Sequence, residues 1–349
     1  MQAAVLYGKE DVRVEEVAPR ALEPGEVRIR IEASLTCGTD LKVFKRGYHA
    51  KMIVPPAVFG HELAGSISEI KLPGSPKNEA GEQEGKAAWR VGDRVVVANS
   101  APCGSCFYCR NGQENLCDDL LFLNGAYAQS IVVPSRLVTK NLLRLRPETA
   151  CPDAALVEPL ACVVQGITDT QLKSGQRVLV LGSGPIGLMF VKLAGLLGCE
   201  VTVSGRGEKR LAVARRLGAA RVIDVARDEA SGSNGEVTFD AVIEAVGKPE
   251  TWEAAVRLVR KGGTVNFFGG CPAGTTVSFD TARIHYSNLK LVASFHHTPR
   301  TIRRALEFIE NGVIRAVDFV DGECPLSELP GLFRSMADGN RAVKTLIRV

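Results

Sequence analysis

The stretch RVLVLGSGPIGLMFVKLAGLLG, residues 177–198, decides the fold of this chain. A short apolar strand leads directly into a glycine-rich turn, and an apolar helical pattern follows the turn. In a G-x-G-x-x-G turn, the first glycine permits the tight bend, the second lets a pyrophosphate approach the backbone, and the third lets the helix pack on the strand. The N–H groups that begin the helix attract phosphate. The stretch therefore predicts a dinucleotide site with contacts from Gly182, Gly184, Pro185, Ile186 and Gly187.

The sequence around this turn alternates apolar strands with helical patterns from Gln176 onward. The strand runs are 177–184, 200–206, 239–247 and 264–270. The helical runs between them are 186–198, 208–218 and 250–262. Parallel neighbours need a crossover connection, and a helix is the usual one. The order predicts an α/β fold with a doubly wound parallel sheet.

The first ~150 residues have a different rhythm, in which short β-rich runs such as 27–35, 94–100 and 127–134 are separated by glycine and proline turns. A chain of 349 residues favours two domains. The last helical pattern, 301–310, and the terminal strand, 343–349, are expected to join the first domain. The polar segment 72–88, rich in glycine, proline and glutamate, is expected to be a mobile surface insertion.

Composition excludes several classes of protein. Hydrophobic content of 45% and charged content of 23% are typical of a soluble globular enzyme. The net charge of +4 comes from dispersed residues, which argues against a nucleic-acid partner. No apolar run approaches the roughly 18 residues of a membrane span. The opening MQAAVLYGKE lacks the pattern of a signal peptide, so we expect a cytoplasmic protein whose ten cysteines stay reduced.

Four of the cysteines lie in one short segment, CGSCFYCRNGQENLC, at Cys103, Cys106, Cys109 and Cys117. Their spacing suits a tetrahedral thiolate site for Zn²⁺, whereas disulfides at this density would close strained small loops. Four protein ligands leave no position for a substrate, so this zinc is expected to be structural.

The residues after the second strand of the parallel sheet bear on the choice between NAD and NADP. A site specific for NAD usually has an Asp or Glu there, whereas this chain has Ser204, Gly205 and Arg206. Ser204 can donate to a 2′-phosphate and Arg206 can pair with it, helped by Lys209 or Arg210. This favours NADP, and a Gly205→Asp change is then expected to shift the preference towards NAD. The alternative, in which Arg206 is solvated and NAD binds through backbone contacts, stays open.

A second metal-type set is distributed along the chain. Cys37 in TCGTD, His61 and Glu62 in FGHE, and Glu158 in LVEPL offer one thiolate, one imidazole and two carboxylates. Three protein ligands and a replaceable fourth position are what catalytic zinc requires.

The ordered combination of CGTD, GHE, C-x2-C-x2-C-x7-C, EP and G-x-G-x-x-G resembles the zinc-dependent medium-chain alcohol dehydrogenases. The EPLAC segment at Glu158 is most similar to their threonine and sorbitol (polyol) dehydrogenase branch. The resemblance covers essentially the whole chain. It implies a GroES-like β-barrel catalytic domain, expected at 1–156 and 296–349, and a Rossmann domain at 157–295.

The resemblance also implies roles for single residues. Cys37 and His61 match the catalytic zinc ligands, and Glu62 and Glu158 match two carboxylates that exchange as third ligand. Thr39 matches the hydroxyl that receives the substrate proton, and Asp40 is similar to the carboxylate that orients His61. The family's relay histidine is replaced by Lys42, so His49 or solvent is expected to complete the relay.

The implied reaction is hydride transfer between a secondary alcohol and a nicotinamide, with two zinc ions per chain, one catalytic and one structural. We expect a polyol, sugar or cyclitol substrate; a β-hydroxy amino acid, as in L-threonine 3-dehydrogenase, is the alternative, followed by a simple secondary alcohol. The segment SFHHTPR, with His296, His297 and Arg300, does not choose between them. A non-catalytic zinc and dinucleotide sensor is the hypothesis outside enzymes.

Relatives in this branch imply a homo-oligomer, with a tetramer favoured and a dimer as the alternative. The family pairs its Rossmann sheets edge to edge. The run TVNFFGG with the following CPAGTTVSF, residues 264–279, has the apolar content expected of such an edge.

Overall fold

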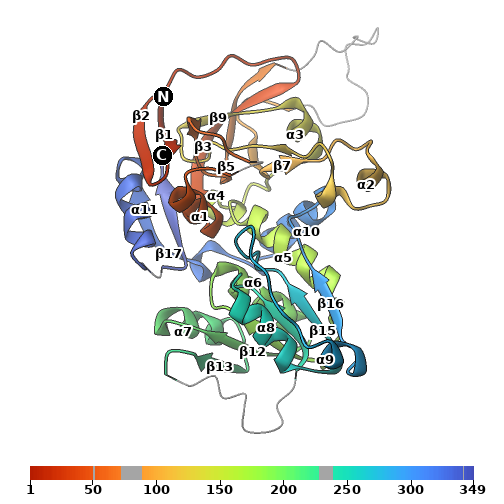
Figure 1. Ribbon diagram of the computed structural model, residues 1–349. Helices are drawn as coiled ribbons and strands as arrows, with labels where there is room; N and C mark the ends of the chain where they lie inside the picture. The colour runs from red at the N-terminus through yellow and green to blue at the C-terminus, as the bar shows by residue number, and fades with distance from the viewer. Residues whose placement is uncertain (50–51, 72–88, 228–238, 341) are drawn as a thin grey trace. The chain divides into compact units, whose positions relative to one another are not determined.

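The structure, a computed structural model, describes residues 1–49, 52–71, 89–227, 239–340 and 342–349. Within these ranges the chain forms two units, Met1–Glu158 with Thr298–Val349, and Pro159–His297. The colours of Figure 1 show that both ends of the chain belong to the first unit. The predicted insertion 72–88 lies outside the described residues. Across the described ranges, no helix combines the length and the apolar character needed to cross a bilayer.

Among its described residues, the second unit contains a six-stranded parallel sheet. Its strands are β11 (Arg177–Leu181), β12 (Glu200–Gly205), β13 (Arg221–Asp224), β14 (Phe239–Glu244), β15 (Val259–Phe267) and β16 (Lys290–Ala293). Its helices are α5 (Val157–Thr170), which enters from the first unit, α6 (Pro185–Leu196), α7 (Glu208–Arg216), α8 (Pro249–Leu258) and α9 (Thr281–Tyr286). The sheet order is β13-β12-β11-β14-β15-β16, and every neighbouring pair is parallel. This is the 3-2-1-4-5-6 order of a Rossmann fold.

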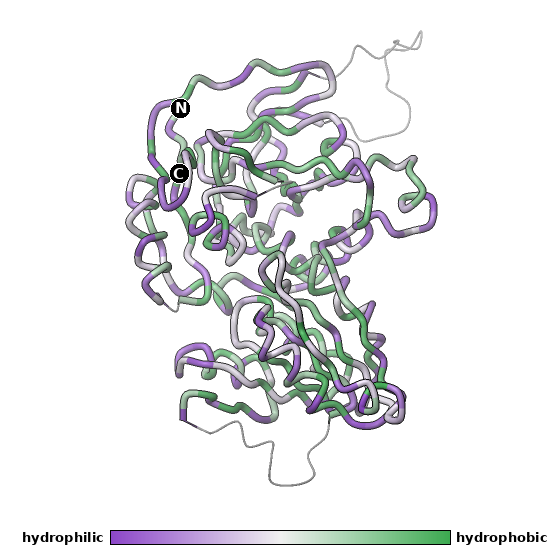
Figure 2. Tube along the Cα trace, in the orientation of Figure 1, coloured by the Kyte–Doolittle hydropathy of each residue, from purple (hydrophilic) through white to green (hydrophobic). Residues whose placement is uncertain are grey.

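The apolar strands form the core of this unit because helices cover both faces of a doubly wound sheet. Val178, Val180 and Val203 are fully buried. Figure 2 shows hydrophobic residues along the central strands and hydrophilic residues on the surrounding helices and loops. The predicted α/β fold is therefore confirmed.

Two details of the predicted sheet are wrong. The helical pattern predicted for 250–262 ends at Leu258, because Val259 is fully buried and already pairs with Phe239 at the start of β15. The run TVNFFGG is not an edge, because β16 pairs with β15 on its outer side. The following residues, 271–279, form no strand.

The first unit is mainly β. Its strands are β1 (Gln2–Gly8), β2 (Asp11–Glu16), β3 (Glu26–Leu35), β4 (Ala57–Val58), β5 (Glu62–Lys71), β6 (Arg94–Val97), β7 (Ser100–Ala101), β8 (Leu121–Phe122), β9 (Ser130–Val133), β10 (Leu142–Arg144), β17 (Val320–Pro325) and β18 (Lys344–Arg348). Its helices are α1 (Gly38–Arg46), α2 (Phe107–Arg110), α3 (Ser135–Lys140), α4 (Cys151–Ala154), α10 (Pro299–Glu310) and α11 (Leu329–Ala337), with short 3₁₀ turns at η1 (Glu114–Leu116), η2 (Ala316–Asp318) and η3 (Leu326–Glu328).

The largest sheet of this unit has the order β10-β6-β5-β3-β18-β17, with β9 also paired to β3. The register places Leu35 of β3 opposite Glu62 of β5 and Leu346 of β18. Residues just after β3, at the start of β5 and at the start of β18 are therefore brought together from three distant parts of the sequence. The candidate catalytic residues lie at this junction.

Candidate metal centres and dinucleotide site

Cys37 lies between β3 and α1 and caps the helix. Its backbone is extended, and its Sγ accepts a hydrogen bond from the amide of Thr39 at 3.4 Å. The Sγ atom therefore lies at the N-terminus of α1, next to the free N–H groups of the first helical turn. Thr39 follows in the first turn of α1 and is partly exposed.

His61 precedes β5 and is 3% exposed. Its Nδ1 lies 2.9 Å from Oδ1 of Asp40, and the other carboxylate oxygen of Asp40 accepts from the hydroxyl of Tyr127 at 2.6 Å. Tyr127 also donates to the carbonyl of Leu35 at 3.1 Å. With Nδ1 held by the carboxylate, Nε2 remains as the ligand atom of this imidazole.

The ligand atoms of Cys37, His61 and Glu62 all lie within 4.8 Å of one another. Burial lowers the pKa of His61, but the negative charges of Asp40 and Cys37 outweigh burial and raise that pKa well above its ordinary value. A thiolate, an imidazole and a carboxylate within 4.8 Å of one another are a donor set for Zn²⁺. The residues therefore fit the expected metal.

Glu62 is fully buried and forms an ion pair with Lys344 of β18. The ammonium lies 2.7 Å from Oε1, contacts Oε2 as well, and donates to the carbonyl of Thr36 at 2.9 Å. Burial lowers the pKa of Lys344, but the Glu62 carboxylate outweighs burial and raises it, so the ammonium stays charged. The negative charge of Glu62 is thus balanced by the ammonium of Lys344.

Glu158, the other predicted carboxylate, is in the first turn of α5 and is 7% exposed. It is not among the three residues grouped around Cys37. Burial raises the pKa of Glu158 to about 7, and the charge of His61 acts in the opposite direction. Glu158 is therefore close enough to the group to respond to its charge.

Lys42 and His49 are the two residues that bear on the exit of the proton relay. Lys42 is an exposed residue of α1. His49 forms an isolated bridge with Ile53, and its Nδ1 accepts from the amide of Met52 at 3.1 Å.

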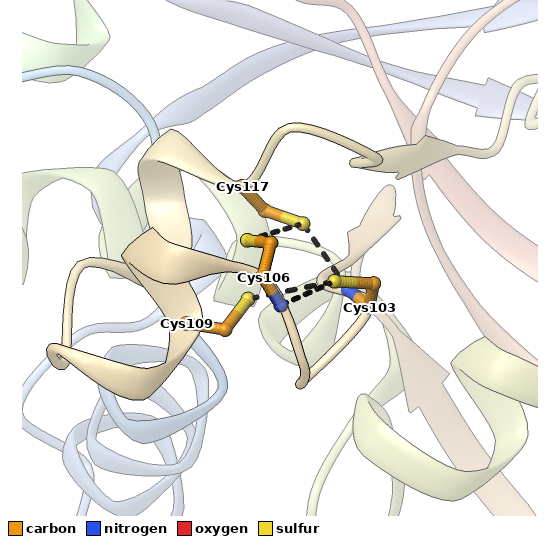
Figure 3. A group of neighbouring side chains, drawn as sticks. All are labelled: Cys103, Cys106, Cys109 and Cys117. Atoms are coloured by element: carbon orange, nitrogen blue, oxygen red, sulfur yellow. Dashed lines mark hydrogen bonds between the residues drawn. The ribbon is translucent and has the colours of Figure 1, made fainter.

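Figure 3 shows Cys103, Cys106, Cys109 and Cys117 turned towards one another, all within 4.8 Å. The sulfur of Cys103 lies 3.9 Å from that of Cys109, and the sulfur of Cys106 lies 3.9 Å from that of Cys117. Tetrahedral Zn–S bonds of about 2.3 Å place sulfurs roughly 3.8 Å apart. Amides of Ser105 and Cys106 donate to Cys103 and lower its pKa to about 6. All ten cysteines are free thiols, and this loop fits a structural zinc.

The glycine-rich turn joins β11 to α6. Gly182 has a φ of +116°, and a Cβ on Gly187 would lie 1.9 Å from the carbonyl oxygen of Gly182. By contrast, a Cβ on Gly184 would meet nothing within 4 Å. The open space lies over the N-cap of α6, where a phosphate can approach the backbone. Pro185 and Ile186 begin the helix, so the turn fits a dinucleotide.

Ser204 and Gly205 end β12, and Arg206 follows on the way to α7. Arg206 and Lys209 are exposed, and neither side chain forms an ion pair with another described residue. The positively charged ends of Arg206 and Lys209 are therefore exposed to solvent. Arg210, the other predicted helper, is partly buried.

Of the three candidates in SFHHTPR, His296 and His297 belong to the second unit and Arg300 to the first. His296 has a φ of +62°, and its ring centroid lies 3.9 Å from that of the buried His297. Arg300 is exposed on α10. A ring nitrogen of His296 lies within 4.8 Å of the sulfur of Cys162 in the same unit.

Two family models match the chain: "Alcohol dehydrogenase GroES-like domain" at residues 23–143 and "Zinc-binding dehydrogenase" at residues 185–311. The chain is 35% identical to a D-altritol 5-dehydrogenase of Agrobacterium fabrum, with 89% of each chain covered. The chain belongs to the zinc-dependent medium-chain alcohol dehydrogenases. The predicted family, the GroES-like and Rossmann folds and the dehydrogenase class are therefore confirmed.

Other members of this family are similar over most or all of the chain. A sorbitol dehydrogenase of Bacillus subtilis is 26% identical over 99% of this chain and 97% of its own length. An L-threonine 3-dehydrogenase of Pyrococcus horikoshii is 32% identical over 78% of this chain and 76% of its own length. A zinc-binding dehydrogenase of Sinorhizobium meliloti, solved bound to NADP, superimposes with a TM-score of 0.87 at 27% identity, covering 100% of this chain and 99% of that one.

Sequence reasoning missed Lys344 and Tyr127. Lys344 lies 282 positions from Glu62, and Tyr127 lies 87 positions from Asp40, so no local spacing points to either. Their polar groups have a function only after the strands of the first unit have paired.

Proposed function

We propose that this dehydrogenase oxidises a secondary alcohol of a polyol, sugar or cyclitol with NADP, and reduces the corresponding carbonyl in reverse. The observation that carries the proposal is the donor group of the partly exposed Cys37 and the buried His61 and Glu62, with its supporting residues Asp40 and Lys344. A protein that only senses a dinucleotide has no need for a thiolate, an oriented imidazole and a hydroxyl residue together.

We infer that Cys37, His61 and Glu158 hold the catalytic zinc, because Lys344 already occupies both oxygens of Glu62. Bound there, zinc would supply the Lewis acidity that lowers the pKa of a substrate hydroxyl. Asp40 fixes the ring of His61 so that Nε2 faces the metal position. Thr39, two residues after Cys37, receives the substrate proton at its hydroxyl.

The preference for NADP rests on the absence of an acidic residue at the end of β12 and on the exposed charge of Arg206. A guanidinium without an ion pair among the described residues is suited to a 2′-phosphate. The S. meliloti relative, which was solved with NADP, supports the same preference.

A β-hydroxy amino acid is the second candidate substrate, and the similarity to an L-threonine 3-dehydrogenase is what favours it. A polyol is preferred because the D-altritol and sorbitol dehydrogenases are similar over more of the chain.

Formation of reduced nicotinamide, followed by absorbance with a panel of polyols, sugars, cyclitols, L-threonine and simple secondary alcohols, tests the proposal directly. Each substrate is tried with NADP and with NAD. We expect turnover with a polyol-type substrate and NADP, and no turnover with Cys37→Ser or His61→Ala. Both variants should still bind the dinucleotide, because the glycine-rich turn between β11 and α6 binds phosphate without the metal. Turnover of L-threonine alone would select the second candidate, and no turnover of any alcohol would contradict both.

We also propose a homo-oligomer, with a tetramer favoured, working in the reducing cytoplasm that suits ten free thiols. Support for assembly comes from Tyr286, 82% exposed at the end of α9, just before the edge strand β16. Light scattering is expected to give a mass of four chains of 37.4 kDa. A stable monomer at micromolar concentration would overturn this proposal.

A further inference from the structure

Ser183, the second residue of the glycine-rich turn, is bound to the backbone at the end of β12. Its Oγ lies 3.2 Å from both the amide nitrogen and the carbonyl oxygen of Arg206. A hydroxyl can accept from the first and donate to the second. Ser183 is 5% exposed, so this pair of hydrogen bonds is shielded from water. The main chain that carries the Arg206 guanidinium is therefore fixed to the turn that carries the phosphates.

Ser183 also fills the space beside Gly205. A Cβ built on Gly205 would lie 2.3 Å from Oγ and 2.4 Å from Cβ of Ser183, far inside van der Waals contact. The amide nitrogen of Ser183 is the next neighbour, at 3.0 Å. Gly205 ends β12, where an NAD site places its carboxylate. A side chain at position 205 therefore requires Ser183 to move, so we expect Gly205→Asp alone to destabilise the protein before it can shift the preference.

We propose that Ser183 determines the dinucleotide specificity, through two separate parts of its side chain. The hydroxyl holds Arg206 in place for a 2′-phosphate, and the Cβ excludes from position 205 the carboxylate that would bind ribose hydroxyls. The proposal rests on the proposed preference for NADP. It adds that this preference is set on the glycine-rich turn as well as after β12.

The two parts can be separated with adenosine fragments, whose binding needs neither turnover nor zinc. Titration calorimetry would compare 2′,5′-ADP with 5′-AMP. We expect wild-type protein to bind 2′,5′-ADP at least roughly tenfold more tightly, the effect of a charge-assisted hydrogen bond. Ser183→Ala keeps the Cβ and loses the hydroxyl, so the ratio should fall roughly 2- to 10-fold. A merely structural serine would weaken both fragments equally and leave the ratio unchanged.

The steric part is tested by melting temperature without ligand. Gly205→Asp should lower it, and Ser183→Gly/Gly205→Asp should recover much of the loss and bind 5′-AMP more tightly than 2′,5′-ADP. The matched control is Ser183→Ala/Gly205→Asp, which retains the Cβ at 2.4 Å and should not recover.

Equal melting temperatures for Gly205→Asp and wild type, or equal recovery by the alanine and glycine backgrounds, would overturn the steric part. An unchanged fragment ratio in Ser183→Ala would overturn the hydroxyl part. A wild-type protein that prefers 5′-AMP would contradict the proposed NADP preference instead, and the melting temperatures would still test the exclusion at Gly205.

Discussion

Lys344 forms a buried ion pair with Glu62, one of the two carboxylates expected as third ligand of the catalytic zinc. Glu62 and Glu158 are both buried, and both feel the charge of His61; Glu62 forms a direct ion pair with this ammonium. A buried ammonium and carboxylate are costly to separate, because each would remain charged in a medium of low dielectric. This ion pair is the basis of our proposal that Glu158, and not Glu62, is the third ligand of the catalytic zinc.

We predict that Lys344→Met lowers the free energy of unfolding by about 3–5 kcal/mol, because the buried Glu62 carboxylate loses its partner. Urea denaturation of the protein measures this change. Lys344→Met/Glu62→Gln should recover a large part of the loss, since the uncompensated charge is gone, and Lys344→Arg is the charge-conserving control. A loss below about 1 kcal/mol in Lys344→Met, the range of exposed ion pairs, would show that Lys344 is not buried against Glu62.

Thr39 is the residue at which a substrate proton is expected to leave. We predict that Thr39→Ala lowers kcat by roughly 10²- to 10⁴-fold, the usual range for a lost proton-transfer group. Thr39→Ser retains a hydroxyl and should keep most of the rate. Steady-state kinetics with the best substrate of the panel decide the matter, and a near-normal rate in Thr39→Ala would place the relay elsewhere.

At the scale of single elements, α6 contains two glycines that differ in the space available for a Cβ atom. A Cβ on Gly187 would collide with the carbonyl of Gly182, whereas a Cβ on the exposed Gly195 would meet nothing within 4 Å. We predict that Gly187→Ala destabilises the protein by about 1–3 kcal/mol. Gly195→Ala, the matched control in the same helix, should stabilise it by about 0.5–1 kcal/mol. Thermal unfolding measures both, and a neutral Gly187→Ala would contradict the close approach of α6 to β11.

The parallel sheet could be predicted from sequence because each strand and each crossover helix has its own local pattern. The predictions failed where local pattern and pairing disagree. Residues after Leu258 continue a helical pattern, but Val259 pairs with Phe239 and joins β15. β16 was missed because it is short and begins with Lys290, so an apolar run did not mark it.

The candidate sites also differ in whether a local sequence pattern marks their residues. The four-cysteine loop and the glycine-rich turn were predicted from spacing alone, and the structure brings the residues of each together. Cys37, His61 and Glu62 needed the family resemblance as well. Lys344 has no such signal, because its partner lies on another strand far away in the sequence. The steric demand of Ser183 on Gly205 likewise depends on a turn and a strand end meeting in space.

At the scale of the whole molecule, the first unit is assembled from both ends of the chain. The donor group of Cys37, His61 and Glu62 comes from the N-terminal part, whereas Lys344, which pairs with Glu62, comes from the last strand, β18, next to β3. We therefore expect the proposed metal centre to be complete only when β18 has joined the sheet. The four-cysteine loop, in contrast, collects its ligands from fifteen consecutive residues, 103–117.

Two independent zinc centres in one chain are the central proposal for this dehydrogenase, and metal analysis of purified protein can count them. We predict close to two zinc ions per wild-type chain and close to one in both Cys37→Ser and Cys103→Ser. The remaining ion should support turnover only in Cys103→Ser, whose melting temperature should fall because its loop has lost a structural metal. One zinc ion or none in carefully prepared wild-type protein would rule out two separate centres, as would loss of both ions in Cys37→Ser.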